Sequence, residues 1–125
     1  MEYFLIALMG ALGAMARYGV GRLISVSFPL QTLLVNVVGC FAFEVVVHYL
    51  PTCARLPREH VTGLSVGFVG SFTTFSAFGA ETSQMLLAGN YLAAICYAAA
   101  SFAGGAAGTL GGLNFTLLLA KLHRA

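Results

Sequence analysis

The chain has 125 residues, of which 59% are hydrophobic and 8% are charged. This composition lies far outside that of a water-soluble globular domain. The formal net charge of +2 comes from a few residues that flank apolar stretches, so it indicates contact with lipid headgroups and excludes the basic surface of a nucleic-acid-binding protein. We therefore expect a protein of the lipid bilayer.

Four apolar stretches are long enough to cross a membrane, which takes roughly 20 helical residues. We predict helices over residues 3–24, 30–50, 60–87 and 91–119, separated by residues 25–29, a polar segment at 51–59 and a tight turn at 88–90. The first stretch has no basic leader and no small-residue cleavage site, so we expect it to be retained. The prediction is an all-α membrane protein with a single transmembrane domain over residues 1–125 and both termini on one side.

The orientation in the membrane is weakly encoded. Lysine and arginine are enriched on the cytoplasmic side of membrane proteins. The side with both termini carries four such residues, which are Arg55, Arg58, Lys121 and Arg124. The other side carries two, Arg17 and Arg22. If Arg17 sits inside the protein the count becomes four to one, which favours cytoplasmic termini; otherwise both orientations stay open.

Glycine marks two further features. Gly63 and Gly67 in the third stretch, and Gly104, Gly108 and Gly112 in the fourth, recur every four residues, a spacing that lets helix backbones approach closely. Residues 67–79 (GFVGSFTTFSAFG) then combine glycine with hydroxyl residues at the centre of the third stretch. Backbone that leaves the helix at this depth must line a cavity or be buried in protein, so we predict a helix broken in mid-membrane.

Catalytic motifs are missing, since the sequence has no nucleophile elbow, no phosphate-binding loop and no metal-binding histidine spacing. We therefore predict that the chain is not an enzyme. Glu44 and His48 are four residues apart in the second stretch, which suits a proton relay or a metal pair. Because they lie toward the end of that helix, we favour the simpler interpretation of a hydrated carboxylate.

Several polar residues lie within the apolar stretches. Arg17 lies about 21 Å along the first helix, where it either reaches for the headgroups or faces a water-filled vestibule that attracts anions. Asn36 lies in mid-span, where its amide either bonds a neighbouring helix or donates to a passing anion. Ser101 and Thr109 share a broad face of the fourth helix with Gly105, and their hydroxyls bond either their own backbone or a ligand.

Phe75 and Phe78 flank hydroxyl residues in the segment expected to break the third helix. Phenylalanine in a membrane usually packs or faces lipid, but the edge of its ring carries partial positive charge and can face an anion. A small anion is strongly hydrated, so a pore must offer many donors and positive edges, whereas fixed full charges bind it too tightly to release it. These residues therefore favour an anion pathway.

Three blocks of this sequence resemble the small bacterial fluoride channels, also called the CrcB or Fluc family. They are residues 10–18 (GALGAMARY), residues 32–39 (TLLVNVVG) and residues 73–78 (TTFSAF) followed by Glu81. The resemblance covers nearly the whole chain. It implies an antiparallel, dual-topology homodimer in the bacterial inner membrane, with two fluoride pores along the interface and a structural sodium ion at its centre.

The resemblance also assigns roles to particular residues. It implies that fluoride passes an aromatic and polar lining, that Arg17 faces the vestibule, and that backbone carbonyls of Gly70 and Thr73 bind the sodium ion. The implied pore lining is Asn36, Phe75, Ser76, Phe78, Tyr97, Ser101 and Thr109. The sequence departs from the family at three positions: Ala77 stands in place of threonine, Gly105 in place of a hydroxyl residue, and Gln31 in place of glycine.

The leading hypothesis is thus a homodimeric channel that passes fluoride down its gradient out of the cell. Four helices of this length enclose too little space for a pore, so we expect the route to lie between subunits. A proton-coupled exporter of small cations is the alternative, and it requires an essential carboxylate, for which Glu44 and Glu81 are the candidates. A structural subunit of a larger membrane complex, which would pass no ion, is the third possibility.

Overall fold

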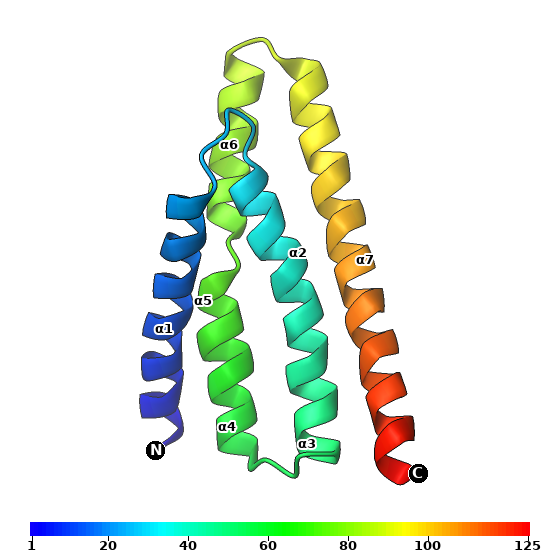
Figure 1. Ribbon diagram of the computed structural model, residues 1–125. Coiled ribbons are helices and arrows are strands. Elements are labelled where there is room, and N and C mark those ends of the chain that lie inside the picture. The colour runs from blue at the N-terminus through cyan, green and yellow to red at the C-terminus, as the bar shows by residue number, and fades with distance from the viewer.

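The computed structural model describes all 125 residues, and it contains helices and loops with no strand. Four of its helical spans, at Glu2–Leu23, Leu30–Thr52, Arg58–Leu87 and Tyr91–Arg124, are long and apolar enough to cross a membrane. The prediction of an all-α, multi-pass membrane protein with four such helices is confirmed. Figure 1 shows both termini at one end of the molecule, opposite the turn between the third and fourth spans.

The second and third spans are built from several segments. The first span is α1 (Glu2–Leu23), and the fourth is α7 (Tyr91–Arg124). The second consists of α2 (Leu30–Glu44), the π-helical η1 (Val45–Tyr49) and α3 (Leu50–Thr52). The third consists of α4 (Arg58–Thr62), the π-helical η2 (Gly63–Val69), α5 (Gly70–Phe72) and α6 (Phe75–Leu87).

The ends of the spans have local causes. The turn between α6 and α7 places Gly89 at φ +78°, a conformation that favours glycine, and the Asn90 N–H closes it by donating to the Met85 carbonyl at 2.9 Å. Helix α7 continues to Arg124, five residues beyond the expected end at Leu119. Its last turn carries Lys121, His123 and Arg124, and cationic side chains stabilise the negative end of a helix dipole.

The glycine stripes lie where two pairs of helices approach closely, as the sequence predicted. A Cβ at Gly67 would lie 2.6 Å from the Ile6 carbonyl oxygen, so η2 approaches α1 at backbone distance. On α7, a Cβ at Gly108 would lie 2.5 Å from the Val37 carbonyl oxygen of α2. Both pairs of helices therefore need glycine at the crossing, because any side chain there would push the backbones apart.

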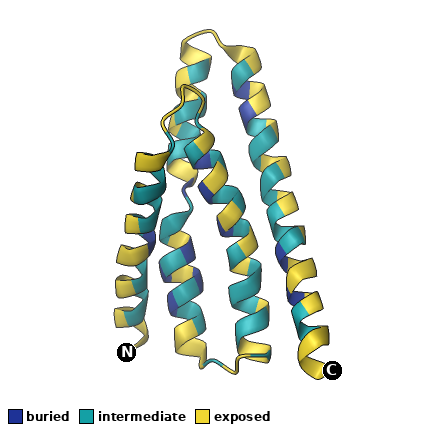
Figure 2. Cartoon of the chain, in the orientation of Figure 1, coloured by how far each residue is buried: buried dark blue, intermediate teal, exposed yellow.

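The chain has almost no interior of its own. Only 13 of 125 residues are buried, and Tyr97 and Val35 are the largest fully buried side chains. Figure 2 shows exposed residues along the outer faces of all four spans. Most of this surface is apolar, so lipid or another protein must cover it.

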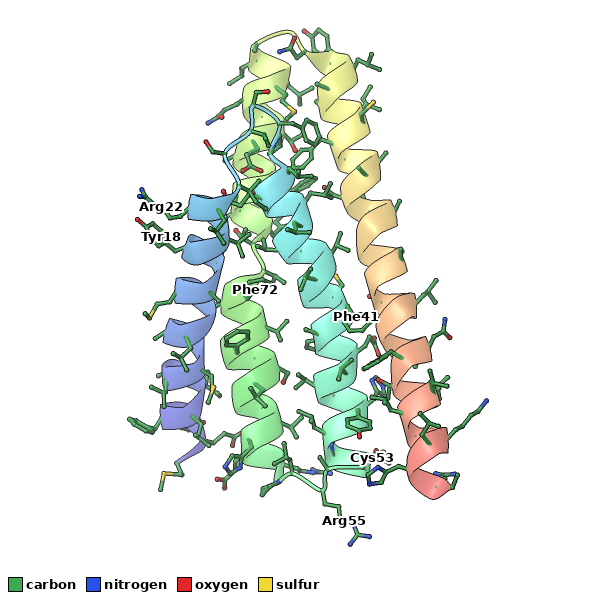
Figure 3. The ribbon with its side chains drawn as sticks, in the orientation of Figure 1. Tyr18, Arg22, Phe41, Cys53, Arg55 and Phe72 are labelled. Atoms are coloured by element: carbon green, nitrogen blue, oxygen red, sulfur yellow. The ribbon has the colours of Figure 1, made fainter.

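Regular helical structure stops for two residues within the third span. Helix α5 ends at Phe72, which is labelled in Figure 3, and α6 begins at Phe75. Thr73 (φ −77°, ψ 158°) and Thr74 (φ −150°, ψ 116°) between them are extended. The Thr74 side chain caps the new helix by accepting a hydrogen bond from the Ala77 N–H at 3.2 Å. The backbone groups of this interruption must therefore find other partners.

Candidate functional site

The interruption is held by Asn36 of α2. Its Oδ1 accepts a hydrogen bond from the Thr74 N–H at 2.8 Å, and its Nδ2 donates to the Thr74 carbonyl at 3.0 Å. One amide thus satisfies both backbone groups of a residue that has left the helix. Of the two roles considered for Asn36, the structure contains the interhelical bond, and one N–H of the amide stays free. Asn36 also lines a cavity of about 240 Å³ with Cys40, Thr73, Thr74 and Phe75.

The hydrogen bond between the Thr74 N–H and Asn36 leaves a backbone carbonyl group of the third span without its helical partner. In a continuous helix the Thr74 N–H would donate to the Gly70 carbonyl, but here it donates to Asn36. The Gly70 carbonyl is left without its helical partner, and Gly70 is exposed. The Thr73 carbonyl lies 3.4 Å from the Arg17 guanidinium, a long contact that satisfies it only in part. The two carbonyls that the resemblance assigns to sodium are therefore both under-used within the chain.

Arg17 lies beside the interruption and faces a cavity of about 520 Å³. We call this space the arginine cavity; its polar lining is Arg17, Gln31, Thr32, Thr74, Ser76 and Glu81. Arg22, by contrast, is exposed and points away from the bundle in Figure 3. The two arginines of α1 thus have different surroundings, and only Arg17 adds positive charge to a polar cavity inside the molecule.

A hydrogen-bonded group centred on Glu81 closes one side of the arginine cavity. The Thr32 hydroxyl donates to Glu81 Oε1 at 2.7 Å, and the Tyr97 hydroxyl donates to Glu81 Oε2 at 2.6 Å. Tyr97 is fully buried, and its ring contacts those of Phe28 and Phe78. From the sequence, Glu81 had been considered as the carboxylate of an exporter and as part of the family resemblance, and Thr32 had been given no role. No local spacing joins three residues on three different helices, so the sequence held no pattern for this group.

Phe75 and Phe78, the two phenylalanines of α6, differ in their surroundings. Their ring centroids are 5.7 Å apart. Phe78 packs against α7, with its centroid 5.2 Å from Tyr97 and 6.3 Å from Phe102. Phe75 is 80% exposed, which means that its own chain leaves the ring uncovered. Phe75 is therefore available to contact whatever lies outside this chain.

Ser101 and Thr109 lie on α7 on either side of Gly105. The Ser101 oxygen is buried and has no hydrogen-bond partner in the chain. Thr109 lines a cavity of about 280 Å³ together with Cys40 and Thr73. Gly105, which lies midway between them, faces Cys40: a Cβ at Gly105 would lie 3.6 Å from the sulfur. The space next to Gly105 is thus occupied by a thiol from α2.

Glu44 and His48 form a separate pair. His48 Nδ1 lies 2.9 Å from Glu44 Oε2, and the His48 side chain is 53% exposed. Neither residue lines the arginine cavity or the cavities next to Asn36 and Cys40. The structure contains no cluster of three or more acidic, histidine or cysteine side chains that could hold a metal ion. This pair therefore does not belong to the polar centre around the interruption.

Four membrane-length helices with polar groups gathered at an interrupted third span define a multi-pass membrane protein with a polar centre. Residues 4–113 match the family described as CrcB-like protein, Camphor Resistance (CrcB). The chain belongs to this family.

Curated relatives carry a functional name. The chain is 40% identical over 119 residues to fluoride-specific ion channel FluC 1 of Bacillus cereus (strain ATCC 14579), an alignment that covers 92% of this chain and 81% of that protein. It is 41% identical over 106 residues to fluoride-specific ion channel FluC 2 of Listeria monocytogenes serotype 4b, covering 84% of this chain and 82% of that protein. Because its relatives are ion channels, the chain is not an enzyme, as predicted.

Proposed function

We propose that this chain forms a fluoride-specific channel that exports the ion passively and lowers its concentration in the bacterial cytoplasm. The observation that supports this most is the arginine cavity, in which Arg17, the hydroxyl groups of Thr74 and Ser76 and an interrupted helix meet inside an otherwise apolar bundle. Fluoride is the chemical that the names of the relatives specify.

Dehydration is the main barrier for such an ion. Removing a small anion from water costs far more than one hydrogen bond returns, so several donors must act together. We propose that Arg17 concentrates the anion in the vestibule and that the free N–H of Asn36, the Ser76 hydroxyl and the edges of Phe75 and Phe78 replace its water. The hydroxyl of Tyr97, which the resemblance assigns to the pore lining, donates to Glu81 and so has no proton left for the anion. The unpartnered Ser101 hydroxyl and Thr109 continue this series of donors along α7. Neutral donors release the ion more readily than fixed charges do.

The channel is proposed to be a homodimer of two antiparallel, dual-topology copies, with two pores along the interface. A chain with 13 buried residues encloses too little space for a continuous pore. The 80% exposure of Phe75 supports the same conclusion, because an exposed aromatic ring next to the polar centre can complete its lining against a second subunit. We propose that the dimer lies in the inner membrane, across which fluoride would leave the cytoplasm.

A structural sodium ion between the two copies completes the proposal. Sodium binds oxygen ligands, and unwound backbone supplies carbonyl oxygens for cations in other membrane proteins. The released Gly70 carbonyl and the partly used Thr73 carbonyl fit this requirement, and equivalent groups of the second copy would complete the set. The ion would supply positive charge that holds four carbonyl dipoles together at the centre of the dimer.

The decisive experiment is an efflux assay with purified protein in liposomes loaded with potassium fluoride or potassium chloride. A fluoride electrode should record rapid valinomycin-dependent release of fluoride, while a chloride electrode records none above protein-free liposomes. The rate should not change when a proton gradient is imposed or collapsed. Absence of any ion release would identify a structural subunit, and release that requires a proton gradient would identify an exporter.

The hydrogen bonds of the two candidate carboxylates favour the channel over the exporter. Both oxygens of Glu81 accept hydrogen bonds from neutral hydroxyls, and Glu44 pairs with His48 outside the polar centre. A proton-coupled exporter needs a carboxylate that exchanges protons with water and contacts its substrate in turn. Because each oxygen of the Glu81 carboxylate accepts a hydrogen bond, this side chain is better suited to a structural role than to carrying protons.

A further inference from the structure

A second polar cavity adjoins the arginine cavity. It has a volume of about 420 Å³ and lies between residues 25–29 and the α6–α7 turn. We call it the loop cavity; the polar residues in its lining are Ser27, Gln31, Glu81, Gln84 and Asn90. Gln31 and Glu81 are the two residues that line both cavities. Gln31 and Glu81 therefore form the boundary between the two cavities, which we call the neck.

The two side chains of this neck differ in what they offer. Glu81 carries a carboxylate whose two oxygens accept hydrogen bonds from Thr32 and Tyr97, so it presents negative charge and no donor. The Gln31 carboxamide is half-buried and makes no hydrogen bond with another group of the chain. An amide group has two N–H donors and can present them to an anion. Of the two residues that line both cavities, Gln31 is therefore the one that can donate hydrogen bonds to an anion, whereas the Glu81 carboxylate repels it.

Glycine on the neighbouring helix makes room for this amide. A Cβ at Gly21 would lie 2.5 Å from Gln31 Nε2, so the Gln31 side chain rests directly on the Gly21 backbone. Gly21 lies four residues after Arg17 on α1 and therefore on the same face of that helix. The face of α1 that carries Arg17 thus also contacts the Gln31 carboxamide, and both side chains line the arginine cavity.

We propose that Gln31 is a pore-lining donor of this chain, and that its amide N–H groups carry a small, strongly hydrated halide past Glu81 from the loop cavity into the arginine cavity. This inference rests on the proposed fluoride channel and adds a residue to it. Gln31 stands where the resemblance leads one to expect glycine, which has no side chain to donate. The neck of this channel is therefore a feature of this particular sequence.

The test compares fluoride efflux from liposomes for variants of Gln31. Gln31→Leu keeps the approximate size of the side chain and removes its donors, so efflux should fall about tenfold, the factor that corresponds to about 1.4 kcal/mol. Gln31→Glu places a second carboxylate next to Glu81 and should lower efflux further. The control is Asn114→Leu, which removes an exposed amide of α7 outside every cavity described above and should change efflux less than about twofold.

A second pair of variants separates the amide from general packing. Gly21→Ala should displace the Gln31 side chain and lower efflux, whereas Gly19→Ala, with nothing within 4 Å of its added Cβ, should not. In a Gln31→Gly background, Gly21→Ala should have no further effect, because no amide is left to displace. All variants are checked for the dimer by size-exclusion chromatography.

The outcomes distinguish this inference from the function on which it rests. If the unmodified chain releases no fluoride, the proposed function fails. If it releases fluoride and Gln31→Leu matches it, the channel stands and the role of Gln31 is overturned. Equal effects of Gly21→Ala with and without the Gln31 side chain would also overturn it, because the glycine would then act through helix packing alone.

Discussion

Asn36 and Thr74, 38 residues apart in the sequence, are joined by two hydrogen bonds between one side-chain amide and the two backbone groups of one threonine. This pairing supplies the partners that Thr74 loses when the chain leaves the helix. In an apolar surrounding each unpaired backbone group costs on the order of 1–3 kcal/mol, so the amide is worth more here than at a hydrated surface. The interruption is therefore a specified part of the structure.

Replacing Asn36 tests this relationship. Asn36→Leu keeps a similar volume and removes both hydrogen bonds, so we expect a loss of about 2 to 4 kcal/mol in stability and at least a tenfold loss of fluoride efflux. Asn36→Asp keeps the acceptor for the Thr74 N–H and loses the donor to the Thr74 carbonyl, and it should also reduce efflux. Thermal unfolding in detergent measures the first effect and the liposome assay the second. An Asn36→Leu protein with unchanged stability and efflux would contradict the assignment.

The two aromatic rings give a second prediction. Phe75→Ile and Phe78→Ile each keep an apolar side chain and remove a ring edge, so each should lower fluoride efflux at least tenfold while the dimer survives. Because Phe75 is 80% exposed in the chain, its replacement should leave the stability of the subunit nearly unchanged. Leu117→Ile, at an exposed position near the end of α7, is the matched control. Wild-type efflux in both phenylalanine variants would remove these rings from the pathway.

The carboxylates provide a third prediction. Glu44→Gln and Glu81→Gln should each retain substantial fluoride efflux, since a channel needs no proton carrier. At Glu81 the amide oxygen can still accept from one hydroxyl, and the amide N–H can donate to the oxygen of the other. A proton-coupled exporter should instead lose all transport in at least one of the two variants. The rates are compared with and without an imposed pH difference.

The helices were predictable because their pattern is local. Each span is a run of apolar residues about as long as a bilayer is thick, and the breaks between spans carry proline, glycine or charge. The glycine stripes on the third and fourth spans are also local patterns, because a spacing of four residues predicts close packing of helices. In the structure, Gly67 lies against α1 and Gly108 lies against α2. The π-helical segments η1 and η2 have no such pattern in the sequence and were not predicted.

Contacts between distant residues were harder to foresee. Thr32, Glu81 and Tyr97 lie on three helices, and only the packing of these helices brings the two hydroxyls to one carboxylate. In the same way, the sequence shows that Gly105 interrupts a series of hydroxyl residues on α7, but only the fold shows that the thiol of Cys40 faces the gap. A single sequence shows which residues are polar, but it does not show which of them are in contact in the folded chain.

The glycines of α7 allow a final prediction that rests on this packing. A Cβ at Gly105 would lie 3.6 Å from the Cys40 sulfur, an ordinary contact, so Gly105→Ser should fold normally and pass fluoride at the wild-type rate or faster, since it adds a hydroxyl between Ser101 and Thr109. A Cβ at Gly108 would lie 2.5 Å from the Val37 carbonyl oxygen, which belongs to backbone and cannot turn aside.

Gly108→Ser should therefore separate α2 from α7 and destabilise the protein by about 1–3 kcal/mol, the usual cost of overpacking. The measurements are the midpoint of thermal unfolding in detergent, the fraction of dimer by size-exclusion chromatography and fluoride efflux. The two variants add the same side chain three residues apart on one helix, so a difference between them reports the local distance to α2. If both unfold alike, or if neither changes stability, the close approach of α2 and α7 at Gly108 is wrong.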